Sequence, residues 1–213
     1  MAADALSEMY TRLMDHFGPQ SWWPGETPFE VMVGAILTQN TNWGNVEKAM
    51  QRLKDAGLLS LEKMVELPSG LLAEYIRPAG YYNIKATRLL NLCRCIVTHG
   101  DGTVAGFLAQ PLTQLRAQLL SVKGIGQETA DSILLYAAQF PVFVVDTYTY
   151  RVLSRHNLVG ETTSYEEMQA LFMDNLNADV KVFNEYHALL VQVGKQYCRK
   201  KNPACSSCPL YGI

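Results

Sequence analysis

Signals for helix starts recur along almost the whole chain of 213 residues. Thr27-Pro28-Phe29-Glu30 combines an N-cap residue, a proline at the first helical position and a carboxylate three residues later. Ser164-Tyr-Glu-Glu167 has the capping-box pattern, and Asp146 can cap the segment that follows it. Ser60 and Ser69 can cap two short helices. These helix-start signals indicate a chain built mainly from helices.

Apolar residues also recur at helical spacing. The segment FEVMVGAILTQ after Pro28 is apolar nearly all round, which predicts a helix that runs through a core. The short run Pro141–Val145 is β-like, but no other stretch of the sequence offers it a partner strand. We therefore expect an all-α fold of roughly ten helices. Further apolar stripes that support it lie within residues 46–53, 82–96, 112–119, 133–137 and 182–197.

The charge balance limits the partners that the chain can bind. It has 18 lysines and arginines against 20 aspartates and glutamates, a formal net charge of -2. Such a chain lacks a broad basic field, so any binding to nucleic acid has to be local. The first residues, MAADALSEMYTRLMDHFG, carry acids and no continuous apolar core, so they resemble neither a signal peptide nor a membrane span. We expect a cytoplasmic protein without a membrane partner.

The stretch Ser121–Ala130, SVKGIGQETA, places two glycines between two apolar helical segments. Gly124 and Gly126 could begin a dinucleotide fingerprint, but that motif needs a preceding strand, and the preceding segment is helical. In a helix-hairpin-helix, glycines allow positive φ and expose N–H groups that attract phosphate without net positive charge. Lys123 would add one cation. An ordinary corner between two helices is the alternative.

Four motifs in order resemble the endonuclease III-like helix-hairpin-helix DNA glycosylases. They are ILTQNTNW, GYYNIKATRLL, LLSVKGIGQETADSILLYA with the following VVDTYTYRVLSR, and the C-terminal cysteine run. The resemblance implies a two-lobed fold with a central helical domain at residues 30–137. Residues 1–29 and 138–213 would form the second lobe, with a C-terminal loop of the iron–sulfur type. A monomer would hold double-stranded DNA with a damaged base between the lobes, acting on nucleoid DNA.

Asp146 occupies the position of the family's catalytic aspartate, in VDT. Base excision breaks the C1′–N bond through an oxocarbenium-like sugar, so a carboxylate near C1′ is expected, as in glycoside hydrolysis. Asp146 would stabilise the cationic sugar and position or deprotonate the attacking water. From the residues alone, a plain N-cap is the alternative.

Glu128 stands where bifunctional members of the family carry a lysine that attacks C1′ as a Schiff-base nucleophile. A carboxylate cannot form an imine, so we expect a monofunctional glycosylase without AP-lyase activity. This chemistry favours a base that already leaves easily, such as the positively charged 3-methyladenine and other alkylated purines.

The three tryptophans of the chain lie in Trp22-Trp23-Pro24 and at Trp43. Tryptophan faces bind cations well, and the anionic Glu128 would add preference for a charged base. SWWPGETPFE, GAILTQNTNW and IRPAGYYN resemble the 3-methyladenine branch, in which these five positions line the base pocket. Trp43 replaces a phenylalanine of that branch. From composition alone, the tryptophans could equally be core or interface residues.

Flipping a base out of the duplex leaves a hole that the enzyme must fill. The resemblance implies that Gln39, after the first core helix, and Tyr81, in the G-x-Y-N turn, enter the stack. The alternatives are that the Gln39 amide satisfies loop backbone and that Tyr81 is a partly buried tyrosine.

Cys198, Cys205 and Cys208 follow the spacing C-x6-C-x2-C, which in a cytosolic protein favours a metal centre over disulfides. The family's [4Fe–4S] loop continues with x5-Cys, so we expect the fourth ligand just past Ile213. Zinc and a metal-free tail are the alternatives. Four basic residues surround this run and are expected to contact phosphates: Lys195, Arg199, Lys200 and Lys201.

These features predict a base-excision DNA repair enzyme that hydrolyses the N-glycosidic bond of alkylated purines. A first alternative is an endonuclease III-like glycosylase for oxidised or mispaired pyrimidines. A second is a non-catalytic helix-hairpin-helix DNA-binding protein. Asp146 separates the enzymes from the second alternative, because a protein that only binds DNA needs no carboxylate near C1′.

Overall fold

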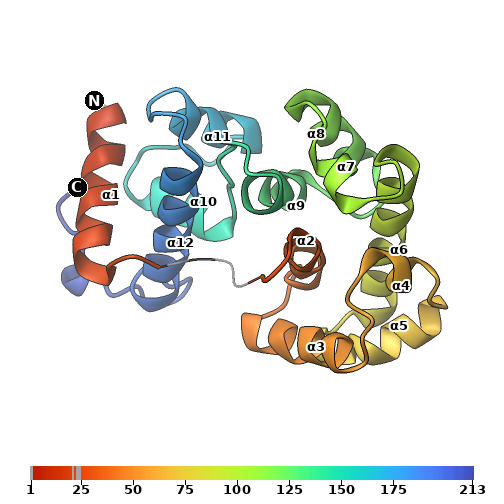
Figure 1. Cartoon of the computed structure of the whole chain (residues 1–213). Helices are drawn as coiled ribbons and strands as arrows, with labels where there is room; N and C mark the ends of the chain where they lie inside the picture. Colours follow the sequence, from red (N-terminus) through yellow and green to blue (C-terminus); the bar gives the residue numbers. More distant parts are fainter. Residues whose placement is uncertain (1, 21, 23–24) are drawn as a thin grey trace. The chain divides into compact units, whose positions relative to one another are not determined.

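The computed structural model describes residues 2–20, 22 and 25–213, and in that part it contains twelve α-helices and no β-strand (Figure 1). The predicted all-α class is confirmed. Pro141–Val145 has no regular secondary structure and pairs with no strand among these residues. None of the described helices is long and apolar enough to cross a bilayer.

The chain divides into two compact units. Met1–Trp22 and Pro141–Ile213 form what we call the terminal unit, and Trp23–Phe140 forms the middle unit. The predicted domain boundaries, at residues 30 and 137, stay a prediction.

The terminal unit is organised around α12, which packs against α1 and α10 (Figure 1). Phe143, from the run Pro141–Val145, stacks on Phe172 with ring centroids 3.8 Å apart. The buried Tyr186 hydroxyl donates to the Leu6 carbonyl oxygen at 2.8 Å. This core fixes the segment that leads into α10. The elements are α1 (Ala2–Phe17), α10 (Thr147–Arg155), α11 (Tyr165–Met173), α12 (Val180–Gln196) and the short η3 (Cys205–Ser207).

The middle unit is built around α2, which is buried along nearly its whole length and packs against α3, α6, α9 and η2. The prediction of a core helix here is confirmed. After α9 the helix widens into the π-helical turn η2. The elements are α2 (Pro28–Leu37), α3 (Trp43–Asp55), α4 (Leu61–Val65), α5 (Ser69–Tyr75), η1 (Arg77–Ala79), α6 (Tyr82–His99), α7 (Val104–Leu108), α8 (Leu112–Ser121), α9 (Gln127–Ser132) and η2 (Ile133–Ala137).

Most predicted helix caps are present. The Thr27 hydroxyl accepts a hydrogen bond from the Glu30 amide at 3.2 Å, and Ser164 forms the predicted capping box of α11. Ser60 caps α4. The predicted cap at Ser69 is wrong, because Pro68 is the N-cap residue and Ser69 is already the first residue of α5. The fixed φ of proline suits a helix start, so α5 begins directly after Pro68.

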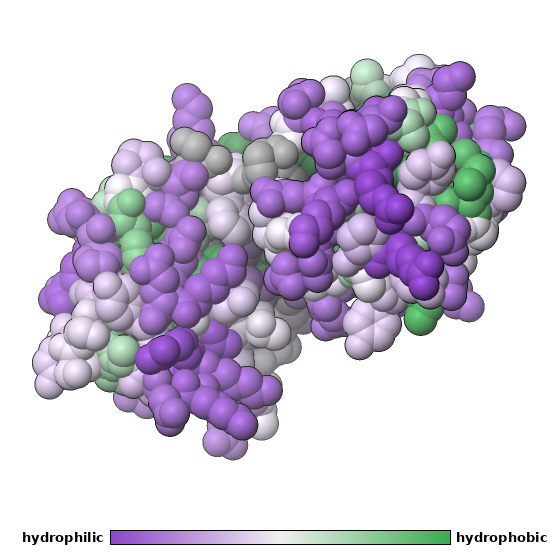
Figure 2. Space-filling model, turned by 90° about the horizontal axis from the view of Figure 1, so that it is seen from below, coloured by the Kyte–Doolittle hydropathy of each residue, from purple (hydrophilic) through white to green (hydrophobic). Residues whose placement is uncertain are grey.

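The surface in Figure 2 is mostly hydrophilic, and hydrophobic side chains appear there in small, separate patches. Apolar residues gather instead in the two cores. The large hydrophobic side chains that are exposed among the described residues are Leu71, Tyr81, Ile84, Val97, Met173 and Tyr211.

Candidate functional site

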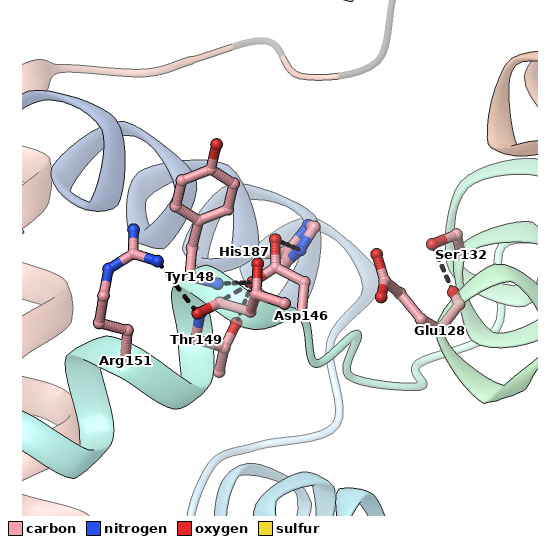
Figure 3. Close-up of polar contacts among 8 residues, drawn as sticks. Glu128, Ser132, Asp146, Tyr148, Thr149, Arg151 and His187 are labelled. Carbon is pink, nitrogen blue, oxygen red and sulfur yellow. Dashed lines mark hydrogen bonds and ion pairs between the residues drawn. The ribbon is translucent and has the colours of Figure 1, made fainter. Parts of the chain in front are cut away.

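Asp146 is the N-cap residue of α10 and lies directly after the buried run Val142–Val145. Its Oδ1 accepts hydrogen bonds from the Tyr148 amide at 2.9 Å and the Thr149 amide at 2.8 Å (Figure 3). The Thr149 hydroxyl also donates to Oδ1, at 3.0 Å. One oxygen of the carboxylate therefore has the ordinary capping role, and its geometry fixes the direction of the other.

The other oxygen, Oδ2, lies 3.6 Å from Nε2 of His187, on α12 (Figure 3). Both side chains are largely buried, with exposed fractions of 11% for Asp146 and 7% for His187. The sequence analysis missed His187. Its only sequence signal is a polar residue within an apolar helical stretch, and nothing in that signal points to Asp146, 41 positions earlier.

The surroundings of Asp146 favour its ionised form. Burial alone would raise the pKa of Asp146, but the nearby His187 imidazole and the hydrogen bonds from Thr149 together lower that pKa below its usual 3.8. The carboxylate is therefore an anion at neutral pH, and it is suited to stabilising a nearby positive charge.

Arg151 fixes α10 against the end of α12. Its Nε donates to the Cys198 carbonyl oxygen at 2.6 Å, and its Nη2 donates to the Gly194 carbonyl oxygen at 3.0 Å. The guanidinium also lies 4.9 Å from the Tyr148 ring centroid. A Cβ at Gly194 would lie 2.5 Å from the Tyr148 ring, so glycine permits this close approach. These contacts hold the start of α10, and with it Asp146, in one place.

In the middle unit, the predicted hairpin is a turn between α8 and α9. Gly124 has φ +101°, a backbone conformation that favours glycine, and a Cβ there would lie 2.4 Å from Cγ of Arg88. Gly126 is the N-cap residue of α9 and provides no side-chain cap. Lys123 is exposed beside this turn. The predicted turn between two helices is thus present, but only Gly124 of its two glycines has the positive φ, while Gly126 has φ -98° and leaves space at the start of α9.

Glu128 is the second residue of α9 and is exposed (Figure 3). The Ser132 hydroxyl donates to its backbone carbonyl oxygen at 2.7 Å, one turn along the helix. The helix thus fixes the backbone of Glu128 at the hairpin and leaves its side chain accessible to solvent.

Gln39 is joined to the hairpin. Its Nε2 donates to the Gly124 carbonyl oxygen at 3.2 Å and to the Thr129 hydroxyl at 2.9 Å, and its Oε1 accepts from Arg88. Tyr81, before α6, is instead 68% exposed and has φ +47°. In this structure the Gln39 amide is engaged by neighbouring groups, whereas Tyr81 projects into solvent.

The tryptophans have different surroundings. Trp43 is the first residue of α3 and donates from Nε1 to Oε1 of Glu47 at 2.7 Å. The Lys195 ammonium lies 5.5 Å from the Trp22 ring centroid, a cation–π contact within the terminal unit. The buried Nε1 of Trp22 has no hydrogen-bond partner among the described residues. Trp23 and Pro24 lie outside the described residues.

The three C-terminal cysteines lie close in the chain's last segment and differ in exposure. Cys198 is buried, Cys205 is exposed and Cys208 is half-buried. Burial raises the pKa of Cys208, a backbone hydrogen bond from Leu210 opposes the rise, and the neighbouring Cys198 and Cys205 add to it. Within the described part of the chain, however, no three histidine, cysteine or acidic side chains are arranged to hold a metal ion.

Comparisons with known proteins agree with this fold. The HhH-GPD superfamily of base excision DNA repair proteins matches residues 33–178. A Methanocaldococcus jannaschii protein, named as a candidate DNA repair glycosylase, is 46% identical over 208 residues, which cover 97% of this chain and 94% of that protein. Endonuclease III of Thermotoga maritima is 28% identical over 85% of this chain and 79% of its own length.

Solved structures give the same result. A crystal structure of H. pylori 3-methyladenine DNA glycosylase bound to 1,N6-ethenoadenine is 31% identical, with a TM-score of 0.77, and covers 92% of this chain and 97% of that chain. An endonuclease III–DNA covalent intermediate has a TM-score of 0.83 at 23% identity, covering 98% of this chain and 93% of that chain, which shows the shared fold. This chain belongs to the HhH-GPD superfamily of base excision DNA repair proteins.

Proposed function

We propose that this chain is a monofunctional DNA glycosylase that hydrolyses the N-glycosidic bond of alkylated purines, such as 3-methyladenine, in double-stranded DNA. The observation that carries the proposal is the buried, anionic Asp146 at the start of α10. The 31% identity to the H. pylori 3-methyladenine DNA glycosylase supports the substrate class.

The geometry of Asp146 supports one of its two expected roles over the other. Oδ1 is occupied by three hydrogen bonds, so Oδ2 is the oxygen that would act on the substrate. The lowered pKa makes this carboxylate a weak proton acceptor and a stable anion. We therefore assign to Asp146 the electrostatic stabilisation of the oxocarbenium-like sugar, together with orientation of the attacking water.

The hairpin would bind the DNA backbone. Lys123 supplies an exposed cation, and the turn through Gly124 and Gly126 brings backbone amides toward a phosphate. Tyr81 would fill the hole that the flipped base leaves, and its high exposure supports this role. Gln39, in the loop after α2, would enter the same hole. The hydrogen bonds of the Gln39 side chain to the hairpin would then have to break. The proposal requires both units to contact one duplex.

Trp22, Trp23, Pro24, Trp43 and Glu128 would line the pocket for the flipped base. The Lys195 ammonium over the Trp22 ring reduces the attraction of that ring for a second cation. Preference for a positively charged base would then depend mainly on Trp43 and Glu128.

The absence of AP-lyase activity is proposed from Glu128. The first turn of α9 carries this carboxylate at the place of the lysine nucleophile. Lys123, on the other side of the turn, would contact phosphate. Without an amine that reaches C1′, the abasic site would be released uncut.

One experiment tests substrate and mechanism together. The protein is incubated with methylated duplex DNA, the released bases are separated, and the strand is sized on a denaturing gel. We expect free 3-methyladenine, an intact strand and no covalent product after borohydride reduction. Release of thymine glycol with a nicked strand would contradict the proposal and favour the endonuclease III-like alternative, which the 28% identical Thermotoga maritima relative supports.

We also propose that Cys198, Cys205 and Cys208 hold a [4Fe–4S] cluster with a fourth ligand beyond Ile213. Three cysteines in one short segment supply the kind of ligand that such a cluster takes, although in the described residues they are not arranged to hold a metal ion. The cluster would supply a cross-link for the last segment, since hydrolysis of a glycosidic bond requires no electron transfer. An absorbance band at about 400 nm in anaerobic protein is expected. Stoichiometric zinc without that band would exclude the cluster.

A further inference from the structure

Lys85 is a buried lysine in α6 with an exposed fraction of 1%. Its ammonium donates to the Leu37 carbonyl oxygen at 2.8 Å, to the Thr41 hydroxyl at 2.7 Å and to the Ala79 carbonyl oxygen at 2.9 Å. An ammonium has three N–H donors, so these three acceptors satisfy it completely.

No carboxylate pairs with this ammonium among the described residues, although a buried charge normally requires a partner. Burial, and then the neighbouring Arg88 cation, lower the pKa of Lys85 to about 8. Two of its acceptors belong to the last residues of α2 and η1. The C-terminus of α2 carries partial negative charge, and the carbonyl groups at the ends of α2 and η1 accept from the ammonium, so these carbonyl groups take the place of a counterion.

The same three contacts join two loops that are distant in sequence. Gln39 lies between Leu37 and Thr41, and Tyr81 lies two residues after Ala79. The Thr41 hydroxyl also donates to the Ala79 carbonyl oxygen, which closes the network. The positive φ of Tyr81 is unusual for a tyrosine and persists only where the surroundings hold it.

We propose that Lys85 is a positioning residue that sets Gln39 and Tyr81 for insertion into the DNA stack. This inference rests on the proposed function, and it adds a residue that does not itself touch the DNA. Lys85 acts by fixing the ends of α2 and η1 to each other. The two loops then present their side chains at a constant separation.

Thr41 offers a test that keeps the buried lysine in place. Thr41→Val is nearly isosteric and removes the hydroxyl, whereas Thr41→Ser keeps it. Binding is measured to a duplex with a tetrahydrofuran abasic-site analogue and to the undamaged duplex. Because hydrogen bonds to charged groups are among the stronger ones, we expect Thr41→Val to lower the preference for the abasic duplex about tenfold. Thr41→Ser should restore it, and 2-aminopurine beside the abasic site should report the lost stacking.

A double-mutant cycle with Tyr81→Ala shows whether the effect passes through the loops. We expect Thr41→Val to cost less in the Tyr81→Ala background than in the wild type, because only the contribution of Gln39 is then left to lose. Full, additive losses would overturn the inference about Lys85 and leave the glycosylase proposal intact. Unchanged abasic-site binding by Tyr81→Ala would overturn the insertion role and this inference with it. Failure of the proposed function itself would show separately, as no release of 3-methyladenine by the wild-type chain.

Discussion

Two helix starts in this molecule share a backbone conformation and differ in their side chains. Asp146, before α10, and Gly126, before α9, both have extended backbone, with ψ of -175° and -178°. The Asp146 carboxylate accepts hydrogen bonds from the first amides of α10, and we call this helix start closed. Gly126 has no side chain that could accept from the first amides of α9, and we call this helix start open.

The difference shows how one physical property serves two purposes. The N-terminus of a helix attracts negative charge. At α10 the chain supplies that charge at the cap itself and holds it as a fixed anion, to which the proposed function assigns a cationic sugar. At α9 the cap position carries no side chain, and the proposed function assigns a DNA phosphate to it. A closed start therefore suits catalysis, and an open start suits binding.

The largest effect is expected from Asp146→Asn. Asparagine caps a helix about as well as aspartate, so the fold should persist. Loss of the anion should slow base release about a thousandfold, as the removal of an electrostatic stabiliser does in other enzymes. Single-turnover release of 3-methyladenine measures the rate. Binding to an abasic-site duplex should change little.

Asp179 provides a matched control in the same unit. Its Oδ1 caps α12 in the same way, accepting from the Lys181 amide at 2.7 Å and the Val182 amide at 3.0 Å. Asp179→Asn should release bases at the wild-type rate. Near-wild-type release by Asp146→Asn would show that Asp146 is only a cap.

Gly126→Asp would convert the open helix start into a closed one. The new carboxylate should accept from the first amides of α9 and stabilise the fold by about a few tenths of a kcal/mol. The same carboxylate should repel phosphate and weaken binding to undamaged duplex about tenfold. Stability and affinity should therefore change in opposite directions, as measured by thermal unfolding and by fluorescence anisotropy.

Gly126→Asn separates capping from charge. It should stabilise α9 to a similar extent and weaken DNA binding less than Gly126→Asp does. Equal affinities for the wild type and Gly126→Asp would contradict a phosphate site at this turn.

The features that the sequence predicted correctly are local. The caps at Thr27, Ser60 and Ser164 and the glycine turn depend on residues a few positions apart, and the family resemblance placed them in order. The missed features join distant segments. His187 meets Asp146 only because α12 packs on α10, and the three acceptors of Lys85 come from two distant segments, the end of α2 with the loop after it and the end of η1. No periodicity encodes such contacts.

A smaller effect is expected from Glu128→Gln, at the open helix start. If the carboxylate favours a cationic base, its loss should lower the preference for 3-methyladenine over neutral hypoxanthine by about fivefold, the scale of an exposed charge interaction. Competition between the two substrates in one reaction measures the ratio. Glu166→Gln, at the equivalent position of α11, is the control and should leave the ratio unchanged. Unchanged selectivity in Glu128→Gln would remove Glu128 from the base pocket.

The smallest effect concerns acid stability, and it distinguishes the two helix starts without any substrate. The folded-state pKa of Asp146 is lowered below 3.8, so its contribution to stability is present above the unfolded-state value and is lost as the pH falls through the folded-state pKa. The difference in unfolding free energy between the wild type and Asp146→Asn should therefore shrink as the pH falls below about 4. Urea unfolding at a series of pH values measures it. Gly126→Asn should not alter the pH dependence of stability, because it removes no titrating group and leaves Glu128, in the same first turn, unchanged. A constant difference between the wild type and Asp146→Asn down to strongly acidic pH would mean that the folded structure does not stabilise the Asp146 anion.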